Sequence, residues 1–191
     1  MALLNQGIRL RMRAVNSAIR SYLVAMLVVF SHSAVSYADG TELEYRVKSA
    51  FLYNFTKFIE WPSASQTKSD FVMCVAGNPE LHAKLVETIG DKQNSGMPIK
   101  FSRIQHPGEA QNCQLLFLGF SEAERLNDWV GALSNEAVLT VSDDSGFIAM
   151  GGMIQFVIVD GKIRFDINQS AANRLSIKMS SKLLGLARNV I

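Results

Sequence analysis

The sequence predicts a single α/β domain with a mixed, mostly parallel sheet of about six strands, flanked by helices, and a C-terminal β-hairpin. Two observations support this prediction. Short β-rich segments alternate with segments of helical periodicity between residues 70 and 141, which is the pattern of βαβ units. The dipeptide Asp160-Gly161 then joins two further β-rich segments, and this dipeptide is a strong hairpin signal. No internal repeat, low-complexity tract or interdomain linker divides the chain.

The first 38 residues have the features of a secretory signal peptide. Four arginines and no acidic residue precede the end of the apolar run 22–30, and the small residues Ser36 and Ala38 follow it. About 20 apolar residues are needed to cross a bilayer, so an uncleaved anchor is the weaker interpretation. We therefore expect residues 1–38 to be a cleaved signal peptide and residues 39–191 to form an exported domain.

The composition of the expected mature chain excludes several functions. Its 153 residues include 15 basic and 17 acidic side chains, so it lacks the clustered positive charge that nucleic-acid binding requires. The length suits one domain with a full core. His82 and His106 have no ligand-like spacing to Cys74 or Cys113, so no metal site is expected. No cofactor is expected either, because the chain has no glycine-rich nucleotide-binding motif.

A helix is expected over residues 41–59. Apolar residues recur there at helical spacing, Thr41 is placed to cap the helix with Glu44 three residues later, and Pro62 ends the element. The apolar surface is wider than one helix face. The helix is therefore either covered on two sides or in contact with a partner, and core packing is the commoner cause.

The next elements alternate. The β-rich segment 70–76 predicts a strand that stops at Gly77, and residues 97–104 predict another strand after a polar turn. Between them, residues 80–89 predict a helix. Its expected apolar side consists of Leu81, Leu85, Val86 and Ile89.

Two more strands enclose a third helix. Residues 114–118 and 137–141 are short apolar segments typical of buried strands. Ser121 is placed to cap a helix over 122–133, with Glu124 positioned for the reciprocal bond of a capping box.

The C-terminal third begins with the predicted hairpin, whose strands are 152–159 and 162–167. Asn168 is placed to cap a short helix. A last helix is expected to begin at Ser180 or Ser181. Its apolar stripe consists of Leu183, Leu184, Ala187 and Val190.

The carboxyl ends of parallel strands are where open α/β sheets bind ligands. The residues expected to line such a crevice are Gly77, Asn78, Gly119, Ser121, Ser142 and Asp143. Helices that follow these strands offer unpaired N–H groups to an anion. Small and capping residues are, however, also what any strand–helix turn requires. No nucleophile elbow surrounds Ser142, and an enzyme is not expected.

The two cysteines, Cys74 and Cys113, are open to three interpretations: a disulfide, two buried thiols or a catalytic thiol. Export favours the disulfide. In doubly wound sheets the first and third strands are commonly neighbours. Cys74 lies in the first expected strand and Cys113 precedes the third, so the two reach a separation of about 5 Å, which a disulfide accepts. We expect this disulfide, with a β-bulge or a later start of the first strand to remove the offset in register.

A long segment of the first expected helix carries a resemblance to a known family. Residues 44–62 read EYRVKSAFLYNFTKFIEWP, and the match continues through residues 138–143, 151–156, 163–168 and 180–187. With these segments the chain resembles the YfiR-like family of exported bacterial regulators over essentially all of residues 41–190.

The resemblance implies a periplasmic regulatory protein with no catalytic activity of its own. It implies that the protein binds the periplasmic domain of an inner-membrane diguanylate cyclase and represses it, which controls cyclic-di-GMP signalling and biofilm formation. It also implies an outer-membrane-associated lipoprotein that relieves the repression, and a homodimer is among the expected assemblies. Cys74 and Cys113 match a cysteine pair that is disulfide-bonded in the family, whereas the family's second pair has no counterpart here.

An alternative function is a periplasmic small-molecule sensor or binding protein that uses the strand-end crevice. Residues 44–62 fit the partner interpretation, because amphipathic and charged side chains beside an apolar surface suit an interface. They suit a helix packed on a sheet equally well. The residues expected to bind the partner are Tyr45, Arg46, Tyr53, Lys57 and Trp61.

Cleavage is predicted after Ala38. Intact-mass measurement on protein from the native host is expected to show residues 39–191 in the periplasmic fraction, because signal peptidase recognises small residues after the apolar segment. A full-length product that stays in the membrane would contradict this prediction.

Overall fold

The computed structural model describes residues 35–62 and 69–191. The chain divides into two compact units, Met1–Glu42 and Leu43–Ile191. Most of the expected signal peptide lies outside the described residues. The described part of the first unit is helical and belongs to α2 (Val35–Phe55). Every strand of the described chain lies in the second unit, to which the following description applies.

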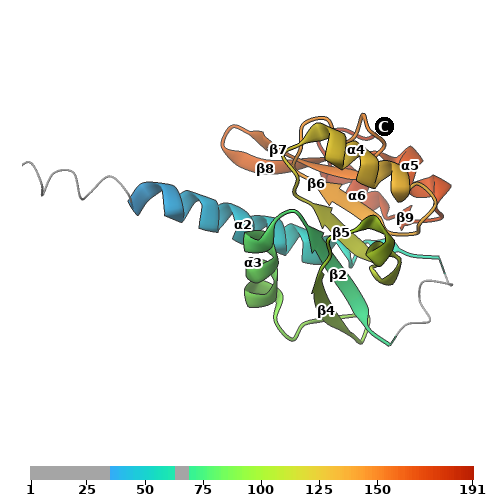
Figure 1. The fold of residues 1–191 in the computed structure, drawn as a ribbon, viewed down its shortest axis with the longest axis horizontal. Helices are drawn as coiled ribbons and strands as arrows, with labels where there is room; N and C mark the ends of the chain where they lie inside the picture. Colours follow the sequence, from blue (N-terminus) through green and yellow to red (C-terminus); the bar gives the residue numbers. More distant parts are fainter. Residues whose placement is uncertain (1–34, 63–68) are drawn as a thin grey trace, which may run out of the picture. The chain divides into compact units, whose positions relative to one another are not determined.

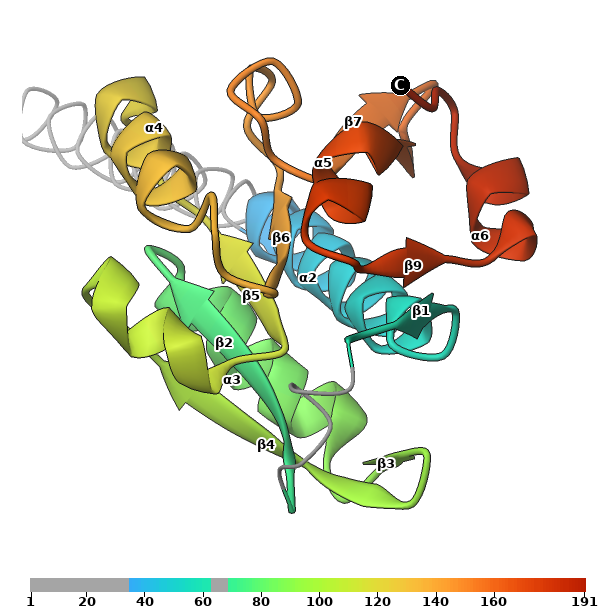
Figure 2. The same cartoon turned by 90° about the vertical axis from the view of Figure 1, so that its right-hand side faces the viewer.

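A seven-stranded mixed sheet forms the centre of this unit (Figures 1 and 2). Its order is β3-β4-β2-β5-β6-β7-β8, with five parallel strands in the middle and an antiparallel strand at each edge. This confirms the predicted α/β fold, to which β3 is an addition. The strands are β2 (Phe71–Ala76), β3 (Gln93–Asn94), β4 (Met97–Arg103), β5 (Leu115–Leu118), β6 (Leu139–Ser142), β7 (Ile154–Val159) and β8 (Lys162–Ile167).

Helices cover both faces of the sheet. Successive side chains of a strand point to opposite faces, so Met73 of β2 enters one core and Cys74 the other. The larger, first core is covered by α2, α3 (Pro79–Ile89), α5 (Gln169–Arg174) and α6 (Ser181–Leu186). The second core is covered by α4 (Ala123–Ala132) and the 3₁₀-helix η2 (Pro107–Asn112).

The first helix differs from its predicted range at both ends. Thr41 lies inside α2 and does not cap it. After Phe55 the hydroxyl of Thr56 donates to the carbonyl of Tyr53 at 2.7 Å. The chain then forms β1 (Ile59–Glu60), which pairs antiparallel with β9 (Lys178–Met179). The helix therefore ends four residues earlier than predicted, and Ile59, its expected last residue, pairs with β9 instead.

Two predicted details of α3 and α4 are wrong. Ser121 is exposed and does not cap α4, which follows Glu122 without a side-chain cap. The buried ring of Phe120, 5.3 Å from that of Trp129, holds this connection and leaves Ser121 at the surface. Val86 is exposed because residues spaced by four along α3 take the buried face.

The C-terminal third follows the prediction closely. Asp160 and Gly161 both have positive φ, 49° and 68°, as a primed hairpin turn requires. Asn168 caps α5 and Ser180 caps α6 through their side-chain oxygens. Val190, however, is exposed, because it lies beyond α6 in a C-terminal segment, 188–191, that hydrogen-bonds to the outer edge of β8 at residues 165–167.

Aromatic rings hold α2 on the hairpin formed by β7 and β8. The ring of Phe55 lies 5.9 Å from Phe156 and 5.1 Å from Phe165. The ring of Phe51 lies 5.9 and 5.7 Å from the same two rings. Such pairs contribute about 0.5–1.5 kcal/mol each beyond the burial of their area, so this cluster is a main contact between the helix and the sheet.

One turn before the aromatic cluster, α2 carries the buried side chain of Lys48. Its ammonium contacts Glu44 on the same helix and lies 2.5 Å from Asp143, which directly follows β6. Burial alone lowers the pKa of Lys48, but the hydrogen bonds to Asp143 and Glu44 outweigh it, so the pKa lies above the ordinary value of 10.5. Lys48 therefore stays charged and ties α2 to the end of β6.

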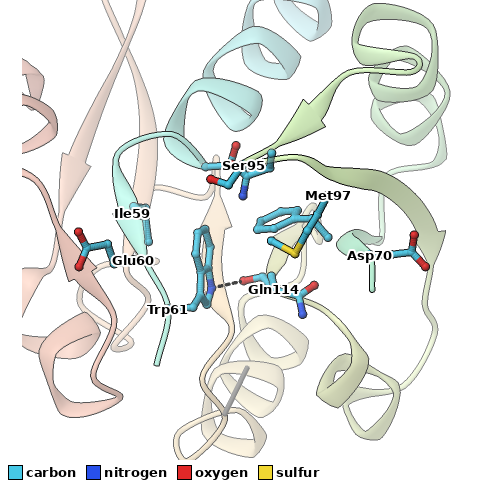
Figure 3. Close-up of a pocket in the computed structure, with 10 residues that line it drawn as sticks. Ile59, Glu60, Trp61, Asp70, Ser95, Met97 and Gln114 are labelled. Carbon is cyan, nitrogen blue, oxygen red and sulfur yellow. Dashed lines mark hydrogen bonds between the residues drawn. The ribbon is translucent and has the colours of Figure 1, made fainter. Parts of the chain in front are cut away.

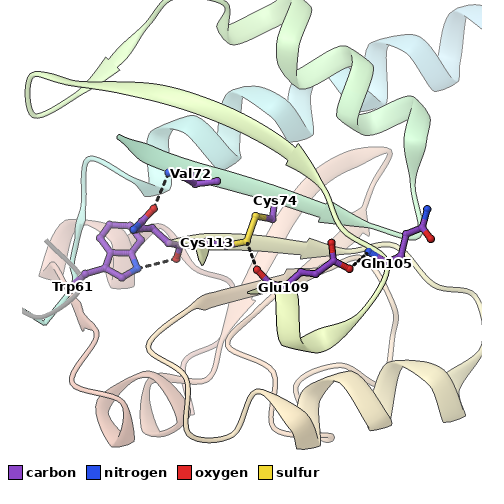
Figure 4. The surroundings of a disulfide bond; sticks show 7 residues. Trp61, Val72, Cys74, Gln105, Glu109 and Cys113 are labelled. Atoms are coloured by element: carbon purple, nitrogen blue, oxygen red, sulfur yellow. Dashed lines mark hydrogen bonds between the residues drawn. A yellow bond between two sulfur atoms is a disulfide. The ribbon is translucent and has the colours of Figure 1, made fainter. Parts of the chain in front are cut away.

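The expected disulfide joins Cys74 in β2 to Cys113, with Cα atoms 5.9 Å apart (Figure 4). As predicted, β2 and β5 are neighbours, and the register sets Cys74 level with Leu116. The start of β2 moves by only one residue, to Phe71. Cys113 precedes Leu116 by three residues, but it lies at the end of η2 and outside β5. Its position is therefore not set by the strand register, and it can approach Cys74.

Breaking the ion pair is expected to destabilise the protein. In Asp143→Ala, buried Lys48 loses one of its two counter-charges, so the free energy of unfolding should fall by about 1–3 kcal/mol. The control is Glu87→Ala, which removes the exposed partner of Lys84 on α3 and should change it by less than about 0.5 kcal/mol. Urea denaturation measures both values, and equal effects would contradict the structural role of the buried pair.

Removing the disulfide is expected to lower stability more strongly. The bridge spans 39 positions, for which loop-closure entropy predicts about 3–4 kcal/mol. The melting temperature of Cys113→Ser should therefore fall by several degrees or more. Reductant should lower that of the wild type similarly and leave the Cys74→Ser/Cys113→Ser double variant unchanged. Free thiols at both positions in periplasmically produced protein would refute the bridge.

Candidate partner interface

The five residues expected to bind a partner lie in different environments. Arg46 and Lys57 are exposed on or just after α2. Tyr45 and Tyr53 are half-buried and pack against the first core. Trp61 is buried. The helix therefore presents charged and amphipathic groups at its surface, but the structure does not gather all five residues on one exposed patch.

Tyr53 forms a small basic surface with two lysines. The ammonium of Lys57 lies 4.2 Å and that of Lys92 5.1 Å from the centre of its ring. Lys57 follows the end of α2 and Lys92 follows the end of α3, where the helix dipole favours positive charge. Stabilisation of the helix ends thus accounts for part of this arrangement, and the cations remain exposed.

Trp61 is a core residue. Its indole N–H donates to the backbone carbonyl of Gln114 at 2.8 Å (Figure 3). Its ring meets that of Phe71 edge-on at 5.1 Å. The side-chain oxygen of Gln114 accepts from the N–H of Val72 at 2.7 Å. Trp61 thus joins the starts of β2 and β5, and its side chain is buried.

A pocket of about 160 Å³ lies beside Trp61 (Figure 3). Asp70, Met97 and Gln114 line it at the amino ends of β2, β4 and β5. The pocket therefore lies at the amino ends of the parallel strands, whereas the expected crevice lies at their carboxyl ends. Sites for small molecules usually have volumes of about 300–1,000 Å³, so this pocket is small for such a ligand.

At the carboxyl ends of the strands, the structure brings Gly77, Asn78 and Gly119 together but fills the space between them. A Cβ on Gly77 would lie 2.5 Å from the ring of Phe120, and one on Gly119 would lie 2.6 Å from Asn78. The side chain of Asn78 also caps α3 by accepting from Leu81. Close packing and capping therefore account for these residue types.

The other expected crevice residues also have internal contacts or lie apart. The hydroxyl of Ser142 donates to the carbonyl of Leu118 at 2.7 Å and accepts from the N–H of Asp144. Asp143 pairs with Lys48. Ser121 lies at the surface after the Phe120 ring. The six residues therefore do not line one shared crevice.

A larger groove, of about 350 Å³, lies between α2 and the hairpin of β7 and β8. Phe156, Ile158 and Ile163 give it an apolar floor, and Glu44 and Asp143 are among its polar walls. Ile158 is 66% exposed. This groove was not predicted from the sequence, because the hairpin signal indicates two paired strands but not which of their side chains other elements cover. A sequence signal for the groove does exist. Ile158 and Ile163 face each other one residue pair away from the Asp160-Gly161 turn, where an apolar pair has little of the sheet left to cover it.

Within residues 35–62 and 69–191, none of the helices is long and apolar enough to cross a membrane.

Two solved structures resemble the chain at low identity. One is a conserved domain protein from Vibrio cholerae O1 biovar El Tor strain N16961, with 12% identity and a TM-score of 0.48 over 63% of this chain and 54% of that one. The other is the ABC domain in complex with L-Trp from Streptococcus pneumoniae, with 13% identity and a TM-score of 0.46 over 64% of this chain and 55% of that one. The chain thus spans about half the length of each.

A search of curated proteins gives no match. A family model described as YfiR/HmsC-like matches residues 45–188. The match includes α2 from Tyr45 onward, all strands of the mixed sheet, the disulfide and the residues of the groove except Glu44. Because the model covers most of the chain, this protein belongs to the YfiR/HmsC-like family.

Proposed function

We propose that the protein is a periplasmic regulator that binds the periplasmic domain of an inner-membrane diguanylate cyclase and represses it. The observation that carries the proposal is membership of the YfiR/HmsC-like family over residues 45–188. Proteins of this kind are periplasmic and act through partner proteins rather than by catalysis. The signal-peptide features of residues 1–38 support the same location.

The surface of α2 supports a role in partner binding. Four of the expected contact residues, Tyr45, Arg46, Tyr53 and Lys57, are at least partly exposed, and we propose them as contacts. Tyrosine and arginine are among the residues enriched in the energetic centres of interfaces. Trp61 is omitted because it is buried.

The alternative, a small-molecule sensor with a strand-end crevice, has less support. Phe120 fills the space beside Gly77, and the hydroxyl of Ser142 is bonded within the chain. A polar ligand at these strand ends would have to displace bonds that the fold already makes. Partner binding is therefore the better account of this arrangement.

Deleting the gene is expected to raise cytoplasmic cyclic-di-GMP several-fold and to increase biofilm, because the cyclase loses its restraint. Expression of the full chain should restore the low level. A control that lacks residues 1–38 should not, since it stays in the cytoplasm. Quantification of cyclic-di-GMP by mass spectrometry tests both results. Unchanged cyclic-di-GMP after deletion, with no membrane cyclase recovered by pull-down, would show that the proposal is wrong.

A further inference from the structure

We propose that the groove between α2 and the hairpin of β7 and β8 receives a basic side chain, an arginine or a lysine, from the partner protein. This inference rests on the proposed function and deepens it, since it names one contact surface and the chemistry of its occupant. The evidence consists of the charge of the groove, its apolar floor and the open surface at its end.

The accessible charge of the groove is negative. The side chains of Glu44 and Asp143 are each 34% exposed, whereas that of Lys48, whose ammonium lies between their carboxylates, is only 4% exposed. Lys48 therefore neutralises one carboxylate from inside and leaves a net charge of −1 facing the groove. A cation from outside is attracted there, and an anion is repelled.

The floor selects among cations. Phe156, Ile158 and Ile163 are apolar, and they lie beside the carboxylates in a groove of about 350 Å³. A bare metal ion would gain nothing from apolar contacts with these residues. An apolar side chain would bury the carboxylates without giving them a partner of opposite charge. Arginine and lysine match both parts, because an aliphatic stem packs on apolar surface while the charged head reaches a carboxylate.

The surface beyond the groove suits a polypeptide. Ile158 is 66% exposed and lies opposite Ile163 across the hairpin. The C-terminal segment covers the outer edge of β8 at Phe165 and Ile167. Among the described residues, no hydrogen bond is seen from that edge at Ile163. An apolar patch beside an open strand edge is a surface that a partner chain covers with its own side chains and peptide groups.

Two basic residues of β8 do not oppose this assignment. Lys162 and Arg164 are exposed, but alternate residues of a strand point to opposite faces. They therefore lie on the face of the hairpin away from Ile163, and neither lines the groove. The charged residues that line it are Glu44, Lys48 and Asp143.

The test changes charge at Ile158, which is exposed enough to be replaced without loss of folding. The variants are Ile158→Ala, Ile158→Glu and Ile158→Arg, and the matched control is Leu186→Arg, at an isoleucine-sized side chain on α6 that is 64% exposed. Binding is measured to the purified periplasmic domain of the cyclase identified in the deletion strain. Unchanged circular dichroism and melting temperature establish that each variant is folded.

A basic partner residue should separate the two charged variants. Ile158→Arg is expected to bind about tenfold or more weakly than Ile158→Glu, because like charges repel and opposite charges attract. Ile158→Ala should lie between them, and Leu186→Arg should bind like the wild type. Wild-type affinity should also fall when salt is raised from about 0.05 M to about 0.5 M, since salt screens the contact.

Repression in cells distinguishes the two proposals. If the wild-type gene restores low cyclic-di-GMP and Ile158→Arg alone fails to do so, both proposals are supported. If the wild type restores it and Ile158→Arg binds and represses as well as Ile158→Glu, the groove assignment is overturned and the proposed function stands. If the wild-type gene does not restore repression, the proposed function fails and the groove assignment fails with it.

Discussion

The packing of α2 against the hairpin of β7 and β8 is the contact on which the rest of the Leu43–Ile191 unit depends. Phe51 and Phe55 come from the beginning of the unit, and Phe156 and Phe165 come from near its end. These contacts therefore join residues about 100 positions apart in sequence and close the first core between the two ends of the unit. Without α2, the antiparallel edge of the sheet would expose the apolar face of an edge hairpin, which is a site for aggregation.

Packing between aromatic rings does not by itself determine how far a helix is shifted along its axis. The ion pair beside the rings does, because each charged group has a defined partner. Lys48 and Asp143 are 95 residues apart in sequence, and their contact fixes which turn of α2 lies over the end of β6. A buried ion pair costs desolvation energy that an apolar pair would not. Lys48 also contacts Glu44, and both carboxylates are partly exposed, so the position of the helix and the negative charge of the groove have one cause.

Most of the fold could be predicted from the sequence, because alternation and turn chemistry are local signals. The Asp160-Gly161 hairpin and the caps at Asn168 and Ser180 depend on residues next to one another, and the structure has them. The predicted end of α2 and the Ser121 cap were wrong because distant contacts decide them. Pairing of β1 with β9 and burial of Phe120 override the local preferences.

The candidate site was harder to predict for a different reason. Trp61 and Arg46 stand in one motif, and composition cannot tell a core aromatic residue from one at an interface, since both environments favour the same side chains. Ile158 was predicted only as part of the hairpin strand 152–159, and its exposure was not predicted. Its exposure depends on how far the hairpin extends past the aromatic cluster of α2, and periodicity contains no such information.

The disulfide and the groove lie on opposite faces of the sheet, so loss of the disulfide need not change the groove. The loop that the bridge closes contains α3, β3 and β4, whereas β6, β7 and β8 lie outside it. Folded proteins open in contiguous cooperative parts. Loss of the bridge therefore makes the β3–β4 flank the weaker part of the molecule, while the flank with α2 and the hairpin keeps its own ring packing and ion pair. Reducing conditions would in this way loosen one half of the sheet and leave the other half, with its groove, in its folded shape.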